Sequence, residues 1–177
     1  MMNITETVNS LRKGVVACML GILCSSCSTS NTEAKMKLEE LIQKLDAANP
    51  WTTEKVETAL ESKLIETVST KTFVSYMMGQ HLYEEGLIIE EVELRLRIGT
   101  NKMIRLIVDL SDSASCFTLD RVKEIFPDNP LSGPGGYTLA GVTYYRTKRS
   151  WGQFSFGFND RRPNCLASII LIPEGEE

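Results

Sequence analysis

Two cysteines stand three residues apart in the stretch Leu23-Cys24-Ser25-Ser26-Cys27. Cysteine pairs at this spacing bind metals, cycle between thiol and disulfide in thioredoxin-type motifs, or form structural disulfides. A metal site needs a second Cys or His pair, and a redox motif needs a surrounding βαβ unit. Neither accompanies this stretch, so the sequence argues against both kinds of site and predicts no metal and no cofactor.

The other residues that could act as catalysts lack the spacing that catalysis requires. His81 is the one histidine in the sequence, so a catalytic triad that uses histidine as its base could be built only around His81. Residues 152–157 place Ser155 one position too far from the first glycine for a nucleophile elbow, and they alternate like a strand. Glu91 and Glu93 could form a carboxylate pair, but they alternate with apolar residues, which predicts a solvated strand face. The sequence therefore predicts no catalytic residue.

The residues before the cysteine pair are typical of a signal peptide. Arg12 and Lys13 precede ten uncharged residues, 14–23, a run too short to span a bilayer. A basic flank, a short apolar segment and small residues behind it mark secretory signals. The alternative is a buried N-terminal helix, but the polar run 25–32 offers it no helical continuation.

Residues 23–27 resemble the signal of bacterial lipoproteins, in which a small-residue box ends in a cysteine that becomes the lipidated N-terminus. The resemblance implies a signal peptide over residues 1–26 and a lipidated tether over 27–33 with Cys27 as the modified residue. It also implies an anchor in the cell envelope. The length of the remaining chain, residues 34–177, predicts a single domain. We expect the outer membrane, with the domain facing the periplasm.

The remaining cysteines and the charge fit an exported protein. Removal of residues 1–26 leaves Cys116 and Cys165 beside Cys27, and an oxidising compartment predicts that the two form a disulfide. Two free thiols would be expected in a cytoplasmic protein. The chain has 19 basic and 23 acidic residues, and this acidic balance argues against a nucleic-acid partner.

Aromatic and basic residues gather over residues 144–154 of this acidic protein. Tyr, Trp and Arg on a rigid turn are typical of interface hot spots. The alternative is that the aromatic residues fill the core. If the binding surface lies elsewhere, the solvated strand face with Glu93 and Arg95 is the next candidate. The predicted partner-binding residues are Arg146, Lys148, Arg149 and Trp151.

Hydrophobic periodicity predicts the elements that position these residues. Leu38, Leu41, Ile42 and Leu45 have helical spacing, as do Val56, Ala59, Leu60 and Leu64. The period changes to two from about Thr67, and returns to helix over 118–126. The predicted fold class is α+β: two N-terminal helices, then an antiparallel sheet of five or six strands with one inserted helix. The predicted strands are 67–78, 91–98 with Ile98 inward, a run with Ile104, Leu106, Val108 and Leu110 inward, 138–147, 153–158 and 166–172.

These features favour a protein that binds rather than catalyses. The leading hypothesis is an inhibitor or immunity-type lipoprotein that neutralises an envelope protein, for example a toxin. A structural or assembly lipoprotein of the outer membrane is the alternative. An enzyme acting on peptidoglycan is a third hypothesis, and it needs His81 or the glutamates in a cleft.

Overall fold

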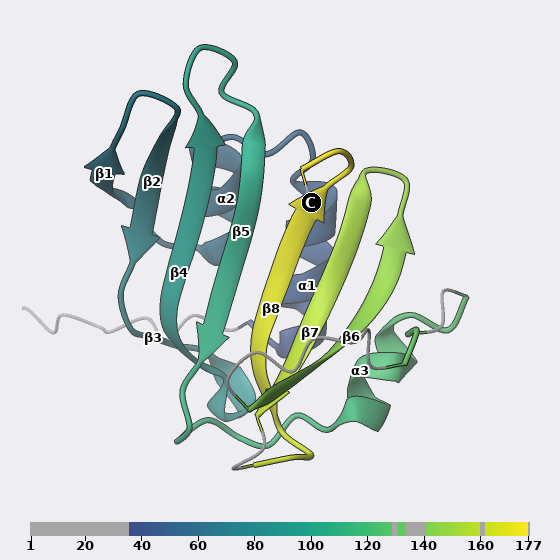
Figure 1. Ribbon diagram of the computed structural model, residues 1–177. Coiled ribbons are helices and arrows are strands. Elements are labelled where there is room, and N and C mark those ends of the chain that lie inside the picture. The colour runs from purple at the N-terminus through teal and green to yellow at the C-terminus, as the bar shows by residue number, and fades with distance from the viewer. Residues whose placement is uncertain (1–35, 129–130, 134–140, 160–161, 177) are drawn as a thin grey trace, which may run out of the picture. The chain divides into compact units, whose positions relative to one another are not determined.

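The computed structural model describes residues 36–128, 131–133, 141–159 and 162–176 (Figure 1). The predicted signal peptide, Cys27 and the tether lie outside these residues, so those expectations stay predictions. No helix in the described part of the chain is long and apolar enough to span a membrane.

The predicted fold class is wrong, because the described chain forms one antiparallel sheet of eight strands with three helices. Sheet dominates the fold, in place of two N-terminal helices followed by five or six strands. The strand order is β1-β2-β4-β5-β8-β7-β6, and the short β3 pairs with β4. In chain order the elements are α1 (Leu38–Ala47), α2 (Thr53–Leu60), β1 (Ile65–Ser69), β2 (Phe73–Met78), β3 (His81–Leu82), a 3₁₀ turn (Glu84–Gly86), β4 (Ile88–Arg97), β5 (Met103–Leu110), α3 (Leu119–Ile125), β6 (Val142–Arg149), β7 (Gly152–Asn159) and β8 (Leu166–Pro173).

One additional strand arises where the sequence lacks a Gly or Pro turn signal, and another because it is very short. The segment 67–78, predicted as one strand, is divided into β1 and β2 by a turn that Thr70 closes. The Thr70 N–H donates to the Phe73 carbonyl over 2.9 Å, and the Thr70 hydroxyl accepts from the N–H groups of Thr72 and Phe73 over 3.2 and 3.1 Å. β3 is two residues long, too short for alternation to show.

The helices follow from apolar spacing and from capping side chains. Thr52 caps α2 by accepting a hydrogen bond from the Lys55 N–H, and Thr118 caps α3 by accepting one from the Arg121 N–H. Each cap satisfies one N–H that the first helical turn would leave without a partner. The buried stripe of α1 is Leu38, Leu41, Ile42 and Leu45.

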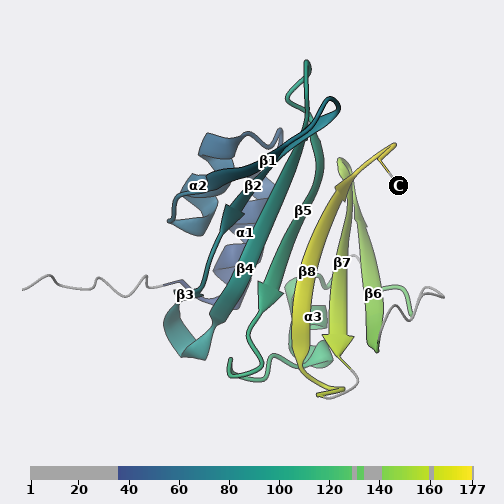
Figure 2. The same cartoon turned by 60° about the vertical axis from the view of Figure 1, so that its left-hand side comes forward.

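All three helices lie against the same face of the sheet (Figures 1 and 2). The core fills the space between the helices and the sheet, and Phe154, Phe156 and Phe158 of β7 are fully buried in it. Phe126, at the end of α3, lies 5.6 Å from the Phe154 ring. Because the helices lie on one face of the sheet, the other face is the surface on which a functional site can lie.

Candidate functional site

The face of the sheet turned away from the three helices is covered by no described helix (Figure 2), and we call it the open face. Three rows of residues cross it over β4, β5, β8, β7 and β6. The acidic row is Glu91, Asp109, Ser168, Gly157 and Tyr144. The middle row is Glu93, Ile107, Ile170, Ser155 and Arg146. The basic row is Arg95, Arg105, Ile172, Gln153 and Lys148.

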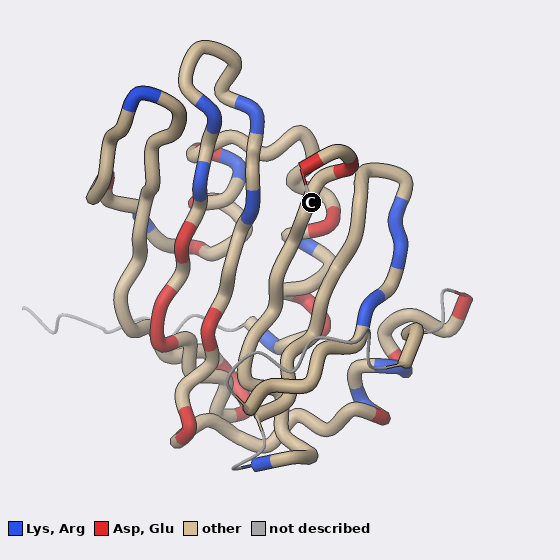
Figure 3. Tube along the Cα trace, in the orientation of Figure 1, with Lys and Arg blue, Asp and Glu red and all other residues tan. Residues whose placement is uncertain are grey.

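Charge changes sign along the strands of the open face. Figure 3 shows basic residues toward one end of β4 and β5 and acidic residues toward the other. Adjacent rows are two residues apart, about 6.6 Å along a strand, so the acidic and basic rows are separated by about 13 Å. The open face therefore presents two regions of opposite charge with the middle row between them.

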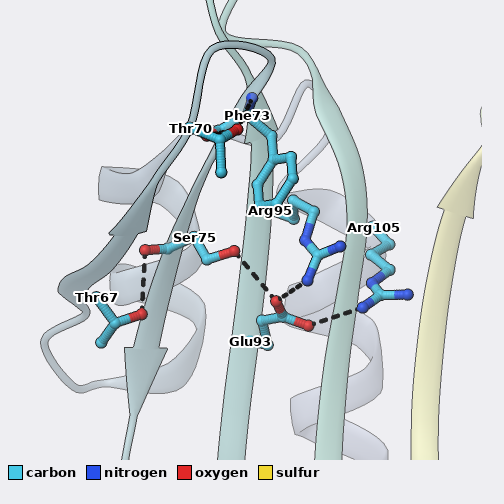
Figure 4. Close-up of polar contacts among 7 residues, drawn as sticks. All are labelled: Thr67, Thr70, Phe73, Ser75, Glu93, Arg95 and Arg105. Carbon is cyan, nitrogen blue, oxygen red and sulfur yellow. Dashed lines mark hydrogen bonds and ion pairs between the residues drawn. The ribbon is translucent and has the colours of Figure 1, made fainter.

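Glu93 forms the centre of a polar cluster that ties β2, β4 and β5 together (Figure 4). Its Oε1 accepts from the Ser75 hydroxyl over 3.1 Å and from the Arg95 guanidinium. Its Oε2 accepts from Arg105 Nη2 over 3.1 Å. The Arg95 guanidinium also lies 4.4 Å from the centre of the Phe73 ring. The cluster fixes two arginines on an exposed sheet surface.

The pKa of Glu93 is set by opposing effects. Burial acts to raise it, but the hydrogen bonds and charges of Arg95 and Arg105 outweigh burial and hold the pKa below its ordinary value of 4.5. A carboxyl whose pKa is lower in the folded chain stabilises the fold above its unfolded pKa, and this contribution is lost as pH falls through the folded pKa.

Replacing Glu93 by Gln is expected to lower the free energy of unfolding at pH 7 by about 1–2 kcal/mol, because two arginines lose a charged acceptor. The difference between Glu93→Gln and the wild type should shrink as pH falls below about 4.5, where the wild-type carboxylate becomes protonated. Urea denaturation at pH 7, 5 and 3 measures both effects.

A substitution of Asp109, in the acidic row, is a control for which the expected change in the free energy of unfolding has the opposite sign. Burial raises its pKa, and the charges of Glu91, Glu90 and Glu93 raise it further. Its ionised form therefore costs stability at neutral pH, and Asp109→Asn is expected to raise the free energy of unfolding at pH 7 and to have no effect once both states are protonated. Destabilisation by both substitutions at pH 7 would contradict this electrostatic account.

The open face also concentrates donors that lack partners. Among the described residues, four buried side-chain polar atoms have no hydrogen-bond partner: Nε of Arg95, Nε of Arg105, Nε of Arg146 and Oγ of Ser155. All four belong to the middle and basic rows. Ser155 is only 3% exposed. Buried polar groups are nearly always paired, so these four atoms are exceptions among the described residues.

The predicted partner-binding residues divide between the two faces of the sheet, because side chains alternate along β6. Arg146 and Lys148 lie on the open face, where Lys148 is exposed. Arg149 lies on the helix side, with its guanidinium 5.2 Å from the centre of the Phe126 ring. The structure thus brings Arg149 and Trp151 together and separates them from the other two.

Asp46, at the end of α1, holds both residues on the helix side. Its Oδ2 accepts from Arg149 Nε over 3.1 Å, and its Oδ1 accepts from Trp151 Nε1 over 2.6 Å. The Trp151 ring meets the Trp51 ring edge-on at 4.5 Å. Both predicted residues therefore have structural partners within the chain, and their binding of another protein stays a prediction.

Asp46 was missed by sequence reasoning, although one signal pointed to it. An acidic residue in the last turn of a helix opposes the helix dipole, which favours cations there. Such a residue implies a cationic partner from another element, but 103 residues separate Asp46 from Arg149, and no local pattern names that partner.

Cys116 and Cys165 form a disulfide, as predicted. It joins the segment before α3 to the residue that precedes β8. Beside it, the Leu166 N–H donates to the Phe117 carbonyl over 2.9 Å. The bond therefore fixes the start of the strand that lies between β5 and β7.

Two of the residues considered for catalysis, His81 and Ser155, lie on different strands, and Cys24 and Cys27 lie outside the described residues. His81 is in β3, and its ring contacts the Tyr83 ring at 4.6 Å. Ser155 is buried on the open face. The described residues contain no group of three or more His, Cys, Asp or Glu side chains that could hold a metal ion.

No known protein family, curated protein or solved structure gives a significant match to this chain. The site therefore has to be interpreted from its own geometry and charge.

Proposed function

We propose that this chain is a lipid-anchored protein of the bacterial envelope that binds a partner protein through its open face, as an inhibitor or immunity-type lipoprotein. The anchor rests on the resemblance of residues 23–27 to a lipoprotein signal, with Cys27 as the lipidated residue. The partner is an envelope protein, such as a toxin, that binding neutralises.

The observation that supports binding is the makeup of the open face. Ile107, Ile170 and Ile172 are half-buried there. Along β5, Ile107 lies between Asp109 and Arg105, and the charged residues of the face lie on the neighbouring strands β4, β5 and β6. Protein interfaces combine an apolar centre with a polar rim, and the open face has this arrangement of isoleucines and charged residues.

Photocrosslinking in the envelope tests this proposal. A photoreactive amino acid at Ile170 is expected to give one discrete protein adduct in the membrane fraction, whereas the same group at Lys55, an exposed residue of α2, is expected to give none. The adduct protein, purified separately, must then bind the purified chain in solution. With Cys27→Ser, chain and adduct should both leave the membrane fraction.

Three outcomes would refute the proposal. Equal crosslinking from Ile170 and Lys55, or failure of the purified adduct protein to bind, would mean that the open face is not the binding surface. Retention of the Cys27→Ser chain in the membrane fraction would mean that the anchor lies elsewhere.

A further inference from the structure

We infer that the segment of the partner that contacts the open face is acidic: its carboxylates bind Arg105, Arg146 and Lys148. This inference rests on the proposed function and names the chemistry of the partner. The acidic segment would lie across the strands, from the Glu93 cluster on β4 and β5 to β6.

The first argument is that the atoms without partners are donors. A guanidinium Nε can only donate, and a Ser hydroxyl donates as well as accepts. Nε of Arg95, Arg105 and Arg146 and Oγ of Ser155 all lack a partner within the described chain. These four atoms are themselves almost inaccessible, so an occupant would contact the outer groups of the same surface. The Arg105 side chain is 40% exposed and Lys148 is exposed, and negative charge complements both cations. Carboxylates bind guanidinium groups with paired, charge-assisted hydrogen bonds.

The second argument is the length of the surface. Arg105 on β5 and Lys148 on β6 are separated by β8 and β7. The pairing of β5 with β8 ends at Leu106 and Leu171, so three strand spacings, or about 14 Å, is the least distance between the two residues. An extended chain covers that distance with about four or five residues. Ile172 of β8 lies between the two basic ends, so the segment that fits has acidic residues flanking an apolar one.

The third argument is that the chain already places carboxylates at the end of this surface. Glu176 forms an ion pair with Arg97, next to the basic row, and its side chain is only 18% exposed. Glu174 lines a hollow of about 400 Å³ together with Lys148, Gln153 and Ile172. Acidic side chains from within the chain thus show that carboxylates fit beside these residues.

The acidic row favours a short acidic protein segment, rather than a longer polyanion such as a nucleic acid, as the occupant of the open face. Glu91 and Asp109 lie about 13 Å from the basic row along the strands, and the chain as a whole carries a net charge of −4. A nucleic acid needs an extended basic track, whereas a short acidic segment can cross the basic row without meeting the acidic one.

The test uses a fluorescent peptide, Glu-Ile-Glu-Gly-Glu-Ile-Glu, and measures anisotropy at low ionic strength. The wild type is expected to bind it, with affinity that falls as salt is added. The double variant Arg146→Gln, Lys148→Gln should bind about tenfold more weakly, consistent with the loss of two charged contacts. The control Lys55→Gln, Lys63→Gln removes the same charge from exposed residues away from the rows and should bind like the wild type. All three proteins should share one melting temperature.

Three results would overturn the inference. They are equal binding of a peptide with Lys in place of Glu, tighter binding of a single-stranded oligonucleotide, and unchanged binding by the Arg146→Gln, Lys148→Gln variant. Crosslinking at Ile170 without binding of the acidic peptide would refute the acidic segment and leave the proposed function in place. Should the double variant unfold, Lys148→Gln alone, an exposed substitution, carries the same test.

Discussion

Replacing Cys116 and Cys165 together by alanine is expected to lower the free energy of unfolding by about 4 kcal/mol. The disulfide joins positions 49 residues apart, and in the chain-entropy model its removal frees a loop of that length in the unfolded state. Cys116 is exposed and Cys165 half-buried, so the lost side chains add little packing cost. Guanidinium denaturation of the oxidised wild type and of the double alanine variant measures the difference.

Reduced wild-type protein is the matched control, since it lacks the bond and keeps both sulfur atoms. Its free energy of unfolding should equal that of the double alanine variant within about 1 kcal/mol, a margin for the small packing change. If reduction has no effect while the double variant is strongly destabilised, packing around the sulfur atoms, and not the cross-link, stabilises this end of the sheet.

Trp151→Ala is expected to lower the free energy of unfolding by about 3 kcal/mol, near the lower end for loss of a large aromatic side chain because Trp151 is half-buried. Its indole contacts Trp51 at 4.5 Å and Phe154 at 5.2 Å, both edge-on, and donates to Asp46. The substitution therefore removes apolar contacts and a charge-assisted hydrogen bond at once. Chemical denaturation at neutral pH gives the value.

Two further substitutions separate these contributions. Trp151→Phe keeps an aromatic ring but loses the Nε1 donor, and it should cost about 1 kcal/mol. Lys148→Ala, three residues away and exposed on the opposite face, should change stability by less than about 0.5 kcal/mol. If Trp151→Ala leaves stability unchanged and weakens partner binding, Trp151 is an interface anchor and its contacts with α1 contribute little.

The sequence patterns predicted local structure better than they predicted the sheet. Alternation over 91–98 is present in β4, where Val92, Leu94 and Leu96 are buried. Ile98, expected inward, is 43% exposed because β4 ends at Arg97. A register shift between β4 and β5 buries Met103, whereas Ile104, expected inward, is only half-buried. Pairing with a neighbouring strand sets the bulges and the ends of a strand. The periodicity of a single strand carries no information about that pairing.

The candidate site was predictable in part. Alternation along β6 already assigns Arg146 and Lys148 to one face and Arg149 to the other, so the two pairs could have been separated from the sequence alone. The open face with Glu93 and Arg95 was predicted as a solvated strand face. The sequence patterns could not predict that β6 lies in the same sheet as β5. β8 joins the two strands through β7, and pairing between strands that are distant in sequence leaves no local pattern.

The place of β8 in the strand order has a consequence for how the chain folds. β8 is the last of the described strands along the chain, yet it pairs with β5 on one side and β7 on the other. Until β8 arrives, two groups of strands, β1 to β5 and β6 with β7, each keep an open edge, and unpaired edges recruit other chains. Joining edges that are distant in sequence is a slow, late step in folding. The sheet of this topology is completed only when β8 is inserted, so truncation within β8 is expected to damage the fold more than truncation of an edge strand.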